Sequence, residues 1–202
     1  MKKPWLNFVG ICSLVFAIVI FCVIFGGYSS LLRSQNRINA AKNYLADQSL
    51  IQLDQIDSLL ALVPSGEDMA KTLNQTADKT NMIISKIKEA EKPIHPDLLM
   101  DYEILQQTLN NQINELVDKL KSTNQASTPA FKEMQTKMAD AQVAVFVTGK
   151  RYNKEAQYFN TRTRVFPGFI IARLFGLDKI QFKELDISRL SAYKEKEAGS
   201  AS

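Results

Sequence analysis

Hydrophobic positions along the chain follow two different patterns. From Phe8 to Tyr28 the residues are almost wholly apolar, and no charged residue lies between Lys3 and Arg33. A helix of about 20 such residues is long enough to cross a bilayer. After this segment, apolar residues recur every three or four positions, the spacing that places them on one face of a helix. The pattern predicts one apolar helix followed by a series of amphipathic helices.

Prolines divide the amphipathic region into four predicted helices. Proline is tolerated in the first turn of a helix but disrupts its interior, so Pro64, Pro96 and Pro129 mark helix boundaries. The first helix is expected to continue from the apolar segment to about Val63, and Ser65 is a candidate cap for the second. The predicted core face of the fourth helix is Phe131, Met134, Met138, Ala141, Val145, Thr148, Tyr152, Phe159 and Phe166.

These elements predict an all-α fold. An N-terminal transmembrane helix is expected to continue into an elongated antiparallel four-helix bundle, because long amphipathic helices joined by short loops pack in this way. A short C-terminal helix follows. The predicted organisation is a tail and anchor over residues 1–29, the bundle over 30–190, and a small, charged and disordered tail over 191–202.

The apolar segment is interpreted as an uncleaved anchor. A secretory signal peptide has an apolar region of roughly 7–15 residues and a small-residue cleavage site, and the sequence "VIFGGYSSLLR" offers no such site. The Lys and Arg residues flanking the segment nearly balance under the positive-inside rule. The short lysine-led N-terminus resembles a signal anchor and favours an extracytoplasmic domain, so we expect a single-pass membrane protein with that orientation.

Charge and cysteine content narrow the choice of partner. The net charge of +4 permits attraction to anionic lipid or to an acidic partner, whereas nucleic-acid binding usually needs a denser basic face. We therefore expect no nucleic-acid partner. Both cysteines, Cys12 and Cys22, lie in the apolar segment, so the remainder of the chain has no disulfide and no thiolate metal site.

The sequence carries no recognisable catalytic motif. Its single histidine, His95, lies between two prolines, and the acids that follow it lack the spacing of metal ligands. His95, Pro96 and Asp97 instead predict the start of a helix. We expect no catalytic residue, no metal and no cofactor, and rank a metal-dependent enzyme well below a non-enzymatic protein.

One motif repeats at a spacing of seven residues in the fourth predicted helix and just beyond it. Tyr152-Asn153 is followed by Phe159-Asn160 and then by Phe166-Pro167. The three aromatic residues continue the core face, and the two asparagines lie on its flank. An asparagine there can bond another helix or a carbonyl group and so fix the packing register. The alternative is a recognition surface whose amides face a partner.

The stretch from "RYN" through the second aromatic-Asn pair to "FPGFIIARLFGL" resembles the C-terminal signature of the LemA family. That resemblance implies a bacterial inner-membrane protein with an N-terminal anchor and a long helical domain, and it implies no established catalytic activity. Members of the family commonly carry basic residues and an Asn after the proline in the segment that corresponds to "IDSLLALVPSGEDM", and this chain lacks them. The residues that carry the resemblance are Tyr152, Asn153, Phe159, Asn160, Phe166, Pro167, Ala172, Phe175 and Gly176.

Two functional hypotheses follow. The first is a non-catalytic scaffold or interaction protein of the bacterial cell envelope, which contacts a partner protein or itself through helix faces. The second is an adaptor that binds anionic lipid or the envelope surface through residues 162–179, where Pro167 lets a basic and apolar segment turn into the membrane plane. The alternative for this segment is that it covers the open end of the bundle. Its candidate membrane-surface residues are Arg162, Arg164, Phe169, Ile170, Arg173, Leu174 and Phe175.

Overall fold

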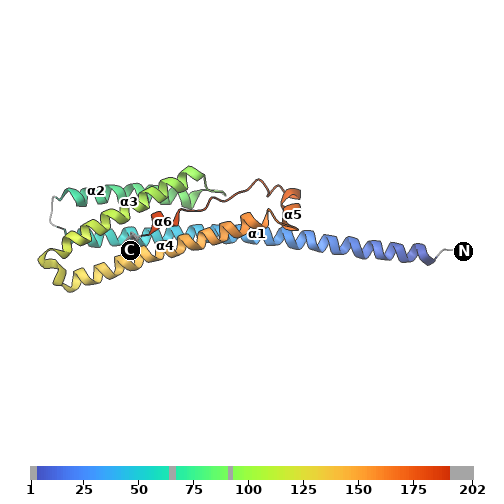
Figure 1. Cartoon of the computed structure of the whole chain (residues 1–202), viewed down its shortest axis with the longest axis horizontal. Helices are drawn as coiled ribbons and strands as arrows, with labels where there is room; N and C mark the ends of the chain where they lie inside the picture. Colours follow the sequence, from blue (N-terminus) through green and yellow to red (C-terminus); the bar gives the residue numbers. More distant parts are fainter. Residues whose placement is uncertain (1–3, 64–66, 91–92, 192–202) are drawn as a thin grey trace, which may run out of the picture.

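A computed structural model describes residues 4–63, 67–90 and 93–191, and within these residues it contains helices and no strand. The four long helices lie side by side along part of their length, and α1 extends far beyond the other three (Figure 1). The elements are α1 (Pro4–Leu60), α2 (Asp68–Glu89), α3 (Pro96–Lys121), the 3-10 helix η1 (Asn124–Ser127), α4 (Pro129–Arg162), α5 (Gly168–Leu174) and α6 (Ile187–Leu190).

Helix α1 combines two different environments in 57 continuous residues. Every side chain from residue 9 to residue 23 is exposed, and the helix that contains them is long and apolar enough, by length and composition, to cross a membrane. From Leu31 onward the helix buries one face, with Leu31, Ile38 and Leu45 at 1–2% exposure. The prediction of an all-α fold with a long apolar N-terminal helix is confirmed.

The predicted starts of α3 and α4 are also confirmed. His95 and Thr128 are the N-caps, each with extended backbone and each followed by a proline in the first turn. The Thr128 hydroxyl accepts a hydrogen bond from the Phe131 N–H at 3.3 Å, which satisfies one of the donors left free at a helix start. The predicted cap Ser65 and all of the predicted tail at 191–202 except Ser191 lie outside the described residues, and Glu67 is the N-cap of α2.

The core consists of two apolar clusters arranged along the helices. The cluster nearer α5 joins the middle of α1 to the first half of α3 and the second half of α4, and it includes Ile38, Leu45, Leu99, Tyr102, Val145, Tyr152 and Phe159. The distal cluster joins the end of α1 to the second half of α3 and the first half of α4, and it includes Ile56, Leu59, Leu73, Leu109, Leu116, Phe131 and Met138.

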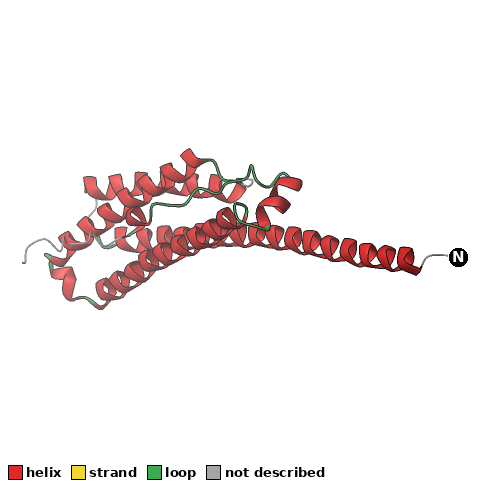
Figure 2. Ribbon diagram, turned by 45° about the vertical axis from the view of Figure 1, so that its right-hand side comes forward, coloured by secondary structure: helices red, strands yellow, loops and turns green. Residues whose placement is uncertain are grey.

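An extended segment completes the first cluster. Helix α5 ends at Leu174, and Gly176, just beyond its C-cap Phe175, has a positive φ of 67° that lets the chain reverse direction. The Leu177 N–H bonds the Ala172 carbonyl at 2.8 Å. The chain then runs back along the helices to α6 (Figure 2). We call residues 178–190 the strap. The strap places Phe182, Leu185 and Leu190 in the core at 0–4% exposure.

The prediction that Phe166 continues the core face of α4 is wrong. Its side chain is 76% exposed, whereas Phe159 is fully buried. Helix α4 ends at Arg162, so the helical spacing that would bring residue 166 back to the core no longer applies. The Phe166–Pro167 peptide bond, which is cis, lies in the turn that follows.

The difference between these two phenylalanines gives a matched pair of substitutions. Phe159→Ala should lower the free energy of unfolding by about 3–5 kcal/mol, because it leaves a cavity in the core. Phe166→Ala should change it by less than about 0.5 kcal/mol. Thermal or urea unfolding of the full-length protein in detergent, followed by circular dichroism, measures both. Equal destabilisation by the two substitutions would contradict the assigned burial.

Candidate functional site

Asn153 and Asn160 hold the main chain of the strap. The Asn160 amide accepts from the Phe182 N–H at 3.0 Å and donates to the Phe182 carbonyl at 2.7 Å. Asn153 makes the same pair of bonds with Leu185, both at 2.7 Å. Each asparagine therefore binds both polar backbone groups of one strap residue. Of the two partners that the sequence allowed, another helix or a carbonyl group, the amides bond carbonyl groups, and these belong to an extended segment of the same chain.

The spacing of the two asparagines matches the geometry of the strap. Seven residues of an α-helix rise about 10.5 Å. Phe182 and Leu185 are three residues apart in the sequence, and three residues of extended chain cover about 10 Å. The strap runs antiparallel to α4, since the later asparagine binds the earlier strap residue. Asparagines seven residues apart on α4 can therefore bind residues three positions apart in the strap.

Tyr152 and Phe159, two of the three aromatic residues of the motif, form the apolar side of the same site. Phe159 meets Phe182 edge to face, with ring centroids 5.2 Å apart. Tyr152 is buried, and its hydroxyl donates to the Lys183 carbonyl at 3.2 Å. Burial raises the pKa of the Tyr152 phenol well above its usual range, so this group remains a neutral donor. Each aromatic residue packs in the core while the asparagine after it faces the strap.

Helix α3 supplies the opposite wall of the site. The buried Glu103 carboxylate accepts from the Asp186 N–H at 2.9 Å, and the Asn110 amide donates to the Leu190 carbonyl at 3.2 Å. Hydrogen bonds from Ser188 lower the pKa of the Asp186 carboxyl, which caps α6. We call this arrangement of Glu103, Asn110, Asn153 and Asn160 the cradle.

The cradle is joined to a buried layer of amide side chains. Gln52 donates to the Asn110 side-chain oxygen at 2.8 Å, Gln142 approaches the same oxygen at 3.4 Å, and Gln106 donates to Gln52. All four side chains are buried. Along their helices Gln52, Gln106 and Gln142 lie between residues of the two apolar clusters, and Asn110 lies just inside the distal one. A polar layer therefore separates the two halves of the core and contacts the end of the strap.

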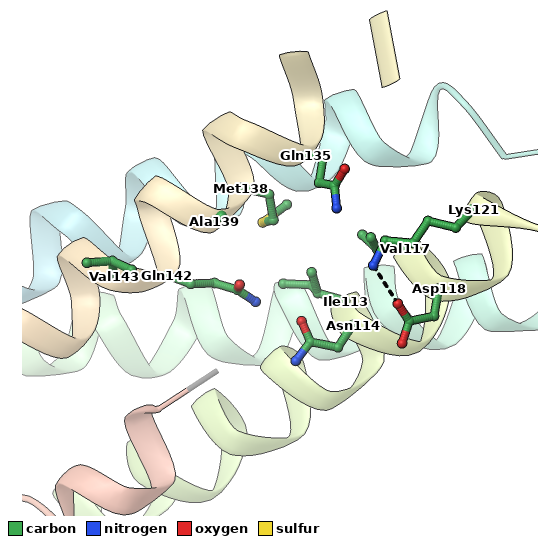
Figure 3. Close-up of a pocket in the computed structure, with 10 residues that line it drawn as sticks. All are labelled: Ile113, Asn114, Val117, Asp118, Lys121, Gln135, Met138, Ala139, Gln142 and Val143. Atoms are coloured by element: carbon green, nitrogen blue, oxygen red, sulfur yellow. Dashed lines mark hydrogen bonds and ion pairs between the residues drawn. The ribbon is translucent and has the colours of Figure 1, made fainter. Parts of the chain in front are cut away.

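Beyond the strap, the seam between α3 and α4 opens into a pocket of about 360 Å³. Figure 3 shows that its lining side chains come from these two helices, with the Lys121–Asp118 ion pair, 2.8 Å long, at one end. Buried Ile113, Val117 and Met138 make the pocket partly apolar. Gln142 links the pocket to the polar layer.

The candidate membrane-surface residues gather around α5, where the exposed part of α1 ends. Ile171 lies directly over Gly27, which has no Cβ to obstruct it, and Phe175 stacks on Tyr28 with ring centroids 4.2 Å apart. The described side chains of Arg164, Phe169, Ile170, Arg173, Leu174 and Phe175 are exposed. The exception is Arg162, which is half-buried and donates to the Ser30 and Tyr158 hydroxyls, both at 2.8 Å.

Catalytic or metal-binding geometry is not found at the one histidine. The His95 ring accepts from the Asp97 N–H at 3.4 Å and serves as a helix cap. Over residues 4–63, 67–90 and 93–191, no group of three or more His, Cys, Asp or Glu side chains is placed to hold a metal ion.

Sequence reasoning singled out Asn153 and Asn160 but missed their partners and the polar layer. One signal was available, because Gln106 and Asn110 lie four and eight residues after Tyr102, a spacing that places them near it on the same side of a helix. Polar residues at buried positions usually have partners. The strap itself gives no such signal, since its few apolar residues are spaced neither like a helix nor like a regular strand.

Removing one amide of the cradle should release part of the strap. Asn160→Ala would leave the Phe182 N–H and carbonyl without these partners, so we expect a loss of about 1–3 kcal/mol in the free energy of unfolding. Hydrogen exchange should accelerate at Phe182, and Asn153→Ala should do the same at Leu185. The exposed Asn74→Ala is the control and should change stability by less than about 0.5 kcal/mol. Unchanged exchange at both strap residues would refute the role of the amides.

Comparison with known proteins identifies the family. The family model described as the LemA family matches residues 60–193, which include α2, α3, α4, α5, the strap and the whole cradle. No curated protein and no solved structure matches the chain. The matched region covers well over half of the sequence, and the chain belongs to the LemA family.

Proposed function

We propose that this protein is a non-catalytic, single-pass membrane-anchored scaffold of the bacterial cell envelope. The anchor holds the helical domain on the extracytoplasmic side of the inner membrane. The domain acts through helix-face contacts with a partner protein or with a second copy of the chain. No cofactor takes part.

One observation carries this proposal. Helix α1 passes from the exposed apolar stretch into the buried core as one continuous helix of 57 residues. A domain attached in this way cannot rotate freely about a linker, so its faces keep a defined height and orientation relative to the anchor. Such rigid presentation is what a scaffold requires.

Helices α2 and α3 offer a suitable face. Met82, Met100 and Ile104 are 62%, 42% and 44% exposed, and a pocket of about 380 Å³ between the helices is lined by Met82 and Ile104 with Lys79, Lys86 and Asp101. Exposed apolar side chains bordered by charges are typical of protein interaction surfaces.

A photo-crosslinking experiment tests the scaffold proposal. A photoreactive amino acid is placed at residue 82 or 104 of the full-length protein in its native membrane, and at the exposed residue 136 of α4 as a control. We expect discrete adducts at residues 82 and 104 that disappear when Met100→Glu adds a charge to the exposed apolar residues of α3. Adducts of equal yield at residue 136, or none at any position, would contradict the proposal. Turnover by the purified protein in a hydrolase screen would also contradict it.

A second candidate function is binding of anionic lipid through residues 162–179. Helix α5 buries Ile171 and Ala172 against the rest of the protein, which leaves Phe166, Phe169, Ile170, Leu174 and Phe175 41–76% exposed at the end of the candidate span. Exposed Arg164, Arg173 and Lys179 lie in the same segment. Apolar side chains bordered by cations suit the boundary between lipid headgroups and acyl chains.

Depth-dependent quenching tests the lipid contact. The full-length protein carries an environment-sensitive fluorophore at residue 170, or at the exposed residue 143 of α4 as a control, and is reconstituted in anionic liposomes. Lipids with a quencher near the headgroup should quench the fluorophore at residue 170 and leave residue 143 bright. Equal and weak quenching at the two positions would show that α5 lies above the membrane.

A further inference from the structure

We propose that the cradle also binds the strap of a second copy, so that two membrane-anchored chains exchange their straps. This inference deepens the proposed function and rests on it in one respect, that anchored copies share a membrane. It names the partner as a second copy of this chain, and it names the segment that passes between them as residues 178–190.

Recognition in the cradle is directed at the main chain. Asn153 and Asn160 bind the N–H and carbonyl of strap residues, and Glu103 and Asn110 bind one backbone group each. The strap residues whose apolar side chains pack in the core are Phe182, Leu185 and Leu190. The strap of a second copy supplies the same backbone groups and the same side chains, so exchange preserves every contact within the site.

Anchoring in one membrane gives the strap of each copy the direction that the cradle of the other copy requires. The strap starts after α5, which packs on α1 at Gly27, and ends where Asn110 binds Leu190, midway along α3. It therefore runs away from the span. Two copies anchored in one bilayer with the same orientation are related by rotation about the membrane normal, and this rotation changes neither height nor direction. The strap of one copy thus meets the cradle of the other in the required orientation.

The connection to the strap limits how the two copies can face each other. Leu177 stays bound to α5, whereas Asp178, Lys179 and Gln181 are exposed. Residues 178–181 span about 13 Å when extended, close to the diameter of one helix. Exchange therefore requires the two α3–α4 seams to face each other. Extension breaks the bond from the Ile180 N–H to the Leu177 carbonyl and the packing of the half-buried Ile180, whereas the contacts of residues 182–190 with the cradle are unchanged. The local concentration of anchored copies must offset this cost and so decides between the closed and the exchanged state.

Complementation between two damaged copies tests the exchange. One full-length copy carries Phe182→Ala and Leu185→Ala, which damage the strap and leave the cradle intact. The other carries Asn153→Ala and Asn160→Ala, which damage the cradle and leave the strap intact. The two copies bear different tags and are co-expressed, and one tag is used to purify them from solubilised membranes.

The mixed pair contains one intact cradle and one intact strap on separate chains. We expect the mixed pair to co-purify severalfold more efficiently than either pair of identical variants. Equal recovery of all three pairs would place any self-contact elsewhere, and no recovery from variants that retain their circular dichroism spectrum would show that the strap binds only its own chain. Either result overturns the exchange and leaves the adducts expected on α2 and α3 unaffected.

A measurement on the chain with an intact strap and cradle covers the case in which a variant fails to fold. A photoreactive amino acid at the exposed position 184 lies in the strap without disturbing its buried residues. It is incorporated in one copy, and the second copy is labelled with ¹⁵N. We expect covalent dimers in which residue 184 is joined to α3 or α4 of the labelled copy. Adducts confined to single copies would refute the proposal.

Discussion

An extended segment buried between helices needs hydrogen-bond partners for its backbone, and the helices cannot supply them from their own backbones. Their N–H and carbonyl groups are already paired within each helix. Side chains must therefore supply these hydrogen bonds. An asparagine amide carries a donor and an acceptor close enough together to bond both the N–H and the carbonyl of one residue. Asn153 and Asn160 do this for Phe182 and Leu185. The closure of the core near α5 depends on these bonds.

The buried amide layer imposes a second constraint on the same region. Gln52, Asn110 and Gln142 come from three different helices and converge on one side-chain oxygen. An axial shift of α1, α3 or α4 relative to the other two would separate these groups in a dry core, where unpaired polar atoms are costly. An apolar core alone would tolerate several such shifts. The layer therefore selects one alignment of the helices and also fixes where the strap ends.

The fold was largely predictable because its signals are local. The length and polarity of the first segment, the proline positions and the repeats of three and four residues depend only on neighbouring residues, and they predicted α1 and the starts of α3 and α4. The cradle was predictable only in part. Heptad spacing identified Asn153 and Asn160, but their partners lie 32 and 22 residues further along the chain, in a segment without regular periodicity. Phe166 was misplaced because periodicity was extended past Arg162, where the helix ends.

The segment from Ile56 to Met69, where the sequence was expected to depart from the family pattern, lies apart from the cradle. That segment ends α1 and begins α2, at the far end of the molecule from α5 (Figure 1). The groups that hold the strap come from α3 and α4. Substitutions in this segment would therefore disturb the packing of the distal apolar cluster and leave the cradle residues in place.

If the exposed apolar stretch of α1 spans a membrane as proposed, the unbroken course of the helix makes the whole domain move when the span tilts. From Leu31 to Leu60 the helix extends about 45 Å beyond the exposed apolar stretch. Helices tilt in a bilayer to match its thickness, commonly by about 20°, and a stiff helix carries that tilt to its far end. The distal turn would then move sideways by about 15 Å, which is more than the width of a helix. A change in membrane thickness would thus become a change in the position of the domain, with no rearrangement inside it.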